Sequence, residues 1–219
     1  MSRFIEVSHP VVAGMKTYPG LPEPSVEVNL TYEASHARYQ EKAEFYIASL
    51  HLCGNTGTYV DSPVHRHRGG SDLASLPLER LADMETVVVD CSGSERAIGA
   101  DALATVEVRY RAVLVRTDFS RHWGTPAYFS EPNPYLTAEA CEMVVRQGAL
   151  FVGIDSLNID DTSDWARPAH TILLGAGIPI CEHMTNLEAV PASGGRLHAV
   201  PIAWVGGASF PVRAYVMTP

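Results

Sequence analysis

The chain has 219 residues, a length that fits one domain over residues 1–219 better than two. Hydrophobic residues make up 46% of it and charged residues 19%, which excludes a disordered chain and allows a substantial core. The net charge is −9, no basic run occurs, and no apolar stretch is long enough to cross a bilayer, so we expect neither nucleic-acid nor membrane binding. Because the first residues lack the pattern of a signal peptide, we expect a cytoplasmic protein.

Short runs rich in valine, isoleucine and leucine recur along the sequence, flanked by turn residues or by helical patterns. Apolar runs bounded in this way are typical of buried strands. Five of them predict strands: "TVVVD" (86–90), "AVLVRT" (112–117), "LFVGID" (150–155), "IPICE" (178–182) and "RAYVM" (213–217). "EFYIASLHL" (44–52) is a further strand candidate.

Helical patterns lie between these runs. In "TAEACEMVVRQ" (137–147), Thr137 can cap the start of a helix and Gly148 its end. A shorter helix is predicted for "ADALATV" (100–106), and "TILLGAG" (171–177) predicts a short helix or turn. Because strands outnumber helices and the two interleave, we predict a mixed α/β fold, with a mixed sheet and flanking helices.

The segment "GNTGTYVDSPVH" (54–65) concentrates polar side chains between glycines and a proline. If it is extended, alternate side chains lie on one face, Asn55, Tyr59 and Asp61 among them. A turn at the proline would then bring His65 within reach of Asp61. Such a pair can share a metal, or the carboxylate can orient the imidazole as an acid or base. In the alternative reading, Asp61 only accepts hydrogen bonds from the turn and His65 is a surface residue.

The same segment resembles the signature of the cyclase-type metal-dependent hydrolases, the family of bacterial arylformamidase and isatin hydrolase. That signature runs His-x-Gly-Thr-His-x-Asp-x-Pro-x-His, and the matching positions are Gly57, Thr58, Asp61, Pro63 and His65. Further segments resemble the family in the same order and cover nearly the whole chain: "YPGLPEP" (18–24), "LVRTDFSRHWGTPAYF" (114–129), "VGIDSLNID" (152–160) and "PAHTILLGAGIPICE" (168–182).

The resemblance implies the family's swivelling β/β/α fold, a homodimer or homotetramer, and hydrolysis of a carbon–nitrogen bond in a small amide or lactam. The residues that it assigns to a metal site are Asp61, His65, His170 and Glu182. The sequence departs from the family at Asn55 and Tyr59, which stand where the family has two histidine ligands of its first metal. An amide oxygen is a weak ligand, and a phenol binds metal well only when it is ionised.

Three accounts of this departure stay open. In the first, the four assigned residues form a rebuilt site for zinc or manganese that activates a water molecule. In the second, catalysis needs no metal: His65 or His170 is the base, and Tyr59 or Asn55 donates a hydrogen bond to the oxyanion. In the third, the protein binds a small molecule without converting it.

Other side chains have two readings each. Trp123, Tyr128 and Phe129 lie in a proline-rich loop and could form an apolar wall for an aromatic or cyclic amide, or could pack into the core. Asp155 follows a predicted strand, where functional sites and structural caps both occur. His51 could in principle reach the site, but a histidine that ends an apolar strand is more often a hydrogen-bonded core residue.

Overall fold

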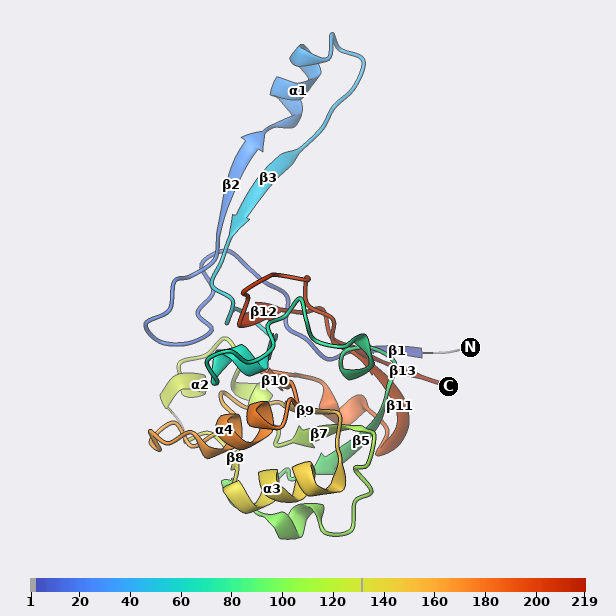
Figure 1. Cartoon of the computed structure of the whole chain (residues 1–219). Helices are drawn as coiled ribbons and strands as arrows, with labels where there is room; N and C mark the ends of the chain where they lie inside the picture. The colour runs from blue at the N-terminus through green and yellow to red at the C-terminus, as the bar shows by residue number, and fades with distance from the viewer. Residues whose placement is uncertain (1–2, 131) are drawn as a thin grey trace.

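The computed structural model describes residues 3–130 and 132–219. The body of the molecule is built on a mixed nine-stranded sheet with the order β1–β13–β11–β5–β7–β9–β10–β4–β12 (Figure 1). The mixed α/β fold predicted from the sequence is therefore confirmed. The strands of this sheet are β1 (Arg3–Glu6), β4 (Tyr59–Asp61), β5 (Met84–Asp90), β7 (Ala112–Arg116), β9 (Phe151–Ile154), β10 (Ile180–Glu182), β11 (Ser193–His198), β12 (Ser209–Pro211) and β13 (Tyr215–Thr218).

The centre of the sheet consists of parallel strands, with β5 beside β7, β7 beside β9 and β9 beside β10. Alternate side chains of β7 enter two cores: Val113 packs with the helices, and Leu114 packs in the second core. A strand that is buried on both faces has a continuous apolar sequence. This explains why the central strands predicted at 86–90, 112–117, 150–155 and 178–182 are confirmed, with slightly shifted ends. The strand predicted at 213–217 is confirmed as the partly buried β13.

The main helices are α3 (Ala138–Gln147) and α4 (Pro168–Gly175). Helix α3 confirms the prediction in detail, because the Thr137 side chain caps its start and Gly148, with φ of +80°, ends it. The helix predicted for 100–106 is only a 3-10 turn. No helix in the described part of the chain is long and apolar enough to cross a membrane. The remaining short elements are α2 (Ala127–Ser130), β6 (Ala97–Ile98), β8 (Tyr135–Leu136), and 3-10 turns at Pro63–His65, Leu78–Arg80, Ala100–Leu103, Phe119–His122 and Leu187–Ala189.

A two-stranded arm projects from the body (Figure 1). It consists of β2 (Ser25–Leu30), α1 (Tyr32–Arg38) and β3 (Ile47–His51), and its two strands form a sheet of their own. Strand β3 confirms the strand predicted at 44–52. Its side chains are largely exposed, in contrast to those of the central strands.

The arm has one apolar and one polar face. Antiparallel pairing sets Val26 opposite Leu50 on one face, and Glu27 opposite Ser49 on the other. Large apolar side chains are exposed along the whole arm, to about half of their surface. These exposed residues are Val26, Val28, Tyr32, Tyr39, Phe45, Tyr46, Ile47 and Leu50.

Candidate active site

The site is built on β4, which lies between β10 and β12 in the main sheet. Tyr59 and Asp61 are two positions apart on this strand, so their side chains leave the same face, and both are buried. The extended segment predicted over 54–61 is too long, because the chain turns at Gly57, whose φ of +65° favours glycine. Asn55 therefore approaches the site from a turn, and not from the strand.

A 3-10 turn returns the chain to Asp61 after β4. Pro63 begins this turn and His65 ends it, which confirms the turn predicted at the proline. His65 Nδ1 lies 3.7 Å from Asp61 Oδ1, and the histidine side chain is 32% exposed. The predicted proximity of Asp61 and His65 is therefore confirmed.

His170 approaches from the opposite side, in the first turn of α4. Its Nδ1 lies 2.6 Å from Asp160 Oδ2. The same carboxylate accepts hydrogen bonds from the backbone amides of Ala169 and His170, at 2.6 and 3.2 Å. Asp160 thus caps the helix and orients the imidazole at once. The sequence analysis missed this residue, although it lies in a segment that resembles the family, "VGIDSLNID".

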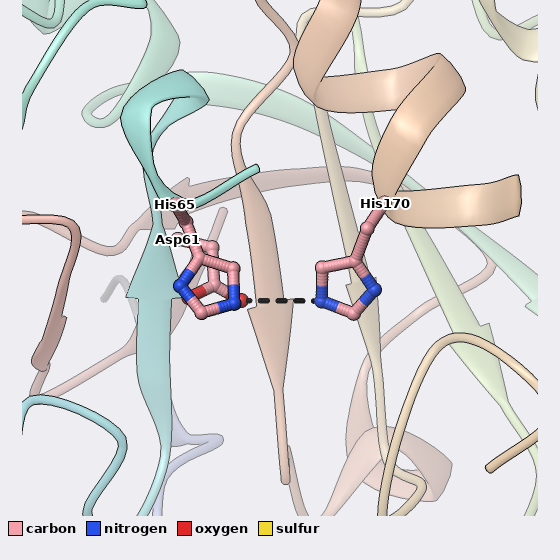
Figure 2. A group of neighbouring side chains, drawn as sticks. All are labelled: Asp61, His65 and His170. Atoms are coloured by element: carbon pink, nitrogen blue, oxygen red, sulfur yellow. Dashed lines mark ion pairs between the residues drawn. The ribbon is translucent and has the colours of Figure 1, made fainter. Parts of the chain in front are cut away.

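Three side chains converge at this point (Figure 2). One ligand atom each from Asp61, His65 and His170 lies within 4.8 Å of the other two. His170 Nε2 is 3.7 Å from Asp61 Oδ2, a buried oxygen without a hydrogen-bond partner among the described residues. Two imidazoles and one carboxylate are a donor set that fits a divalent cation such as zinc or manganese.

Glu182 completes the buried part of the site. Register places it opposite Tyr59, and the Tyr59 hydroxyl donates to Glu182 Oε2 at 2.5 Å. Glu182 Oε1 accepts from the backbone amide of Ile159 at 2.7 Å and lies 3.7 Å from His170 Nε2. Tyr59, which stands where the family signature has a histidine, thus joins a hydrogen-bonded network with Glu182 and the backbone of Ile159.

The pKa values of Glu182, His170 and Tyr59 are all shifted by their surroundings. Burial is the main reason that the pKa of Glu182 is raised to about 7, although His170 lowers it. Burial also lowers the pKa of His170, but the hydrogen bond to Asp160 and the nearby Asp61 carboxylate outweigh this and raise it to about 10. The pKa of Tyr59 is raised well above its usual value by burial first and then by Glu182. Tyr59 is therefore a neutral hydrogen-bond donor.

These groups line a cavity of about 360 Å³. Asn55, Tyr59, His65, His170 and Glu182 all contribute to its wall, so the structure brings together the predicted site residues around one space. Asp61 lies behind them, fully buried. The other lining residues are Tyr18, Leu21, Arg66, Asn158 and Arg167.

The remaining candidates have structural contacts elsewhere. Trp123, Tyr128 and Phe129 pack in an aromatic cluster, in agreement with the core reading and not with the pocket wall. Asp155 accepts hydrogen bonds from the amide and hydroxyl of Thr117, both at 2.6 Å, and is a structural cap. His51 lies on the arm, 3.4 Å from a glutamate.

Ser209 is a second residue that the sequence analysis missed. It lies on β12, directly opposite Asp61, and its hydroxyl donates a hydrogen bond to Asp61 Oδ1. The same oxygen is 3.1 Å from His65 Nδ1. Nothing around this serine in the sequence signals the contact, because its partners lie more than a hundred residues away.

The sequence is similar to those of known proteins. Residues 5–161 match the Cyclase family, described as "Putative cyclase". A kynurenine formamidase of Bacillus cereus is 27% identical over 216 residues, which cover 98% of this chain and 97% of the relative.

Solved structures agree with this match. Isatin hydrolase A from Labrenzia aggregata, bound to benzyl benzoate, is similar with a TM-score of 0.84 at 22% identity, covering 99% of this chain and 94% of that one. A potential metal-dependent hydrolase with cyclase activity has a TM-score of 0.81 at 23% identity, covering 100% and 99%. At these identities the likeness shows a common fold.

Proposed function

The chain belongs to the cyclase family, and from this membership and its site we propose that it is an enzyme that hydrolyses a carbon–nitrogen bond of a small amide or lactam. The observation that carries the proposal is the convergence of Asp61, His65 and His170 beside a cavity. Relatives named kynurenine formamidase and isatin hydrolase support this reaction class. We retain the cytoplasm as the predicted location.

We infer that Asp61, His65 and His170 hold one divalent cation, zinc or manganese. When bound, such a cation lowers the pKa of a water molecule and polarises the substrate carbonyl. Glu182 was expected as a further ligand from the family resemblance. Glu182 is not among the residues whose ligand atoms converge within 4.8 Å of one another, and we assign it to proton transfer instead.

Hydrolysis requires one proton to move from water to the leaving nitrogen. The water oxygen bonds to the carbonyl carbon, and the carbon–nitrogen bond breaks. Glu182 is suited to carry the proton, since its pKa is raised by burial to about 7 and such a group both accepts and returns a proton near neutral pH. Tyr59 donates its only hydroxyl hydrogen to Glu182, so Asn55, which lines the same cavity, is the residue whose amide can donate a hydrogen bond to the oxygen that gains negative charge.

The cavity favours a small aromatic or cyclic amide. Tyr18 and Leu21 supply an apolar wall, and the volume of about 360 Å³ suits a molecule of one or two rings. Arg66 and Arg167 lie on the same wall. Guanidinium groups pair with carboxylates, so a substrate with an acidic group beside its amide fits best.

Turnover of defined amides tests the proposal. Protein loaded with zinc or manganese is assayed with N-formyl anilines, isatins and aryl lactones. We expect hydrolysis by the wild type, and loss of both bound metal and turnover in Asp61→Ala. His51→Ala is the matched control, because this histidine lies on the arm, and it should retain both. Metal binding without any hydrolysis by the wild type would contradict the assignment as an enzyme.

A metal-free hydrolase is the alternative that a specific observation favours. Asp160 holds His170 through a 2.6 Å contact, and with its pKa raised to about 10 the imidazole is suited to act as the general acid that protonates the leaving nitrogen. Turnover that persists after complete chelation of metal would support this alternative. Ligand binding with no turnover in either state would instead support a small-molecule-binding protein.

We also infer that the chain forms a homodimer or homotetramer through its arm. A two-stranded sheet with both faces in water is marginally stable alone. The eight exposed apolar side chains of the arm present on the order of 800 Å², about what one partner contributes to a standard interface. A second copy of the chain is the partner that we propose, because two copies cover both arms reciprocally.

Adjacent residues on opposite faces of the arm provide a matched test. Val26→Lys places a charge on the apolar face, and Ser25→Lys places it on the polar face. We expect sedimentation to show an oligomer for the wild type and for Ser25→Lys, and a smaller species for Val26→Lys. Oligomers of equal size for both variants would contradict the role of the arm.

A further inference from the structure

Ser209 bridges two of the proposed metal ligands. It is buried, and β12 places it directly opposite Asp61. Its hydroxyl oxygen contacts Asp61 Oδ1 and lies 3.1 Å from His65 Nδ1. The three side chains come from two strands and one turn, so only the folded sheet brings them together.

The hydroxyl can donate to only one of these partners, because a serine carries a single hydroxyl hydrogen. The Asp61 oxygen has no proton to give as a carboxylate, and therefore accepts from Ser209. The Ser209 oxygen must then accept the hydrogen bond from His65, which fixes the proton of the neutral imidazole on Nδ1.

The free nitrogen of His65 is consequently Nε2. Figure 2 shows the rings of His65 and His170 turning one nitrogen each toward the other, with Asp61 beside them. Asp160 binds His170 Nδ1 in the same way that Ser209 binds His65 Nδ1. Each imidazole thus has its Nδ1 engaged by a neighbour and its Nε2 turned toward the shared space, and Ser209 also leaves Asp61 Oδ2 as the free carboxylate oxygen.

We propose that Ser209 is a positioning residue that fixes the Nδ1–H tautomer of His65 and aims Asp61 Oδ2, so that both present unprotonated atoms to one cation. The tautomer is a property of the protein alone. The effect on the cation rests on the metal site proposed above, and the two halves are tested separately.

The experiment compares Ser209→Ala and Ser209→Thr with the wild type. Long-range ¹H–¹⁵N spectra of metal-free protein report the His65 tautomer, assigned with His65→Ala. We expect a predominant Nδ1–H form in the wild type and in Ser209→Thr, and a mixture of tautomers in Ser209→Ala. Competition with a chromophoric chelator measures zinc affinity, which should fall 10- to 100-fold in Ser209→Ala and recover in Ser209→Thr.

Ser62→Ala is the matched control. Ser62 is also buried beside β12, but its hydroxyl bonds only the backbone oxygens of residues 207 and 208. A purely structural role for Ser209 predicts equal effects of the two alanine variants. An unchanged His65 tautomer in folded Ser209→Ala would overturn the inference. A shifted tautomer in a protein whose wild type binds no zinc would retain the positioning role and reject the metal site.

Discussion

His170 and Asp160 form one unit: the imidazole Nδ1 lies 2.6 Å from the carboxylate Oδ2, and that carboxylate also accepts the first amides of α4. One side chain therefore sets both the start of the helix and the direction of the ring. The orientation of His170 is therefore coupled to the middle of the loop that connects β9 to α4, and not only to the packing of its own helix.

Asp160→Asn should weaken metal binding. An amide is a poorer partner for the Nδ1 proton, so we expect a loss of 10- to 100-fold in zinc affinity and a decrease of about 1 kcal/mol in the free energy of unfolding. Asp164→Asn is the control, because this exposed aspartate caps a turn in the same loop without touching His170. If Asp160→Asn and the wild type bind zinc with equal affinity in competition with a chelator, the proposed role of Asp160 is contradicted.

Tyr59→Phe should move the acid limb of the pH–rate profile upward. The phenol hydrogen bond lowers the pKa of Glu182, which stands at about 7, so its removal raises that pKa and delays ionisation of the proposed base. The pH dependence of kcat/KM measures the shift. Tyr18→Phe, on the wall of the same cavity, should leave the limb in place. An acid limb at the same pH in Tyr59→Phe would argue against proton transfer by Glu182.

Restoring two histidines should add a cation. Tyr59 and Asn55 stand where the family signature has histidines, and the Tyr59 hydroxyl donates a hydrogen bond to Glu182. We expect one equivalent of metal in the wild type and two in the double variant Asn55→His with Tyr59→His. Plasma mass spectrometry on protein purified without chelator gives the ratio, with the Asn55→His single variant as control. A ratio that stays at one would show that the strand no longer accommodates a second metal.

Asp155 should make the protein less stable as the pH rises from about 4 to 6. Burial raises its pKa from 3.8 to about 6, so in this interval the folded state holds a proton that the unfolded state has released. The free energy of unfolding therefore falls with increasing pH, by up to about 3 kcal/mol, and levels off above pH 6. Denaturant titrations should show this dependence in the wild type and in the exposed-site control Asp90→Asn. Asp155→Asn should lose it, and an identical slope there would disprove the assignment.

The elements that sequence predicts well are those whose burial depends on near neighbours in the sheet. Strand β7 lies between β5 and β9, where its side chains are buried on both faces. The apolar run at 112–117 therefore predicts it well. Strand β3 also contains large apolar residues, Ile47 and Leu50, yet it lies on an exposed arm. An apolar run indicates that its side chains become buried, but not whether they are buried by the same chain or by another one.

In the site too, contacts between residues close in sequence are predictable, and contacts between distant residues are not. The turn at Pro63 and the pairing of Asp61 with His65 are local and predictable. The length of β4 was overestimated because Gly57 has a left-handed conformation that the alternating pattern does not reveal. Ser209 was missed because its contact depends on strand register, which sequence alone does not provide.

The separation of contacts along the chain has a consequence for the order of folding. His170 meets Asp160 across 10 residues, whereas Ser209 meets Asp61 across 148. Contacts between distant residues form slowly, because the entropy of closing a long loop must be overcome first. The imidazole half of the site can therefore assemble early around its own helix, while the carboxylate half waits for the last strands to join the sheet. In refolding experiments, a probe near His170 should report structure earlier than a probe near Asp61. Binding of the cation should coincide with the later of the two signals.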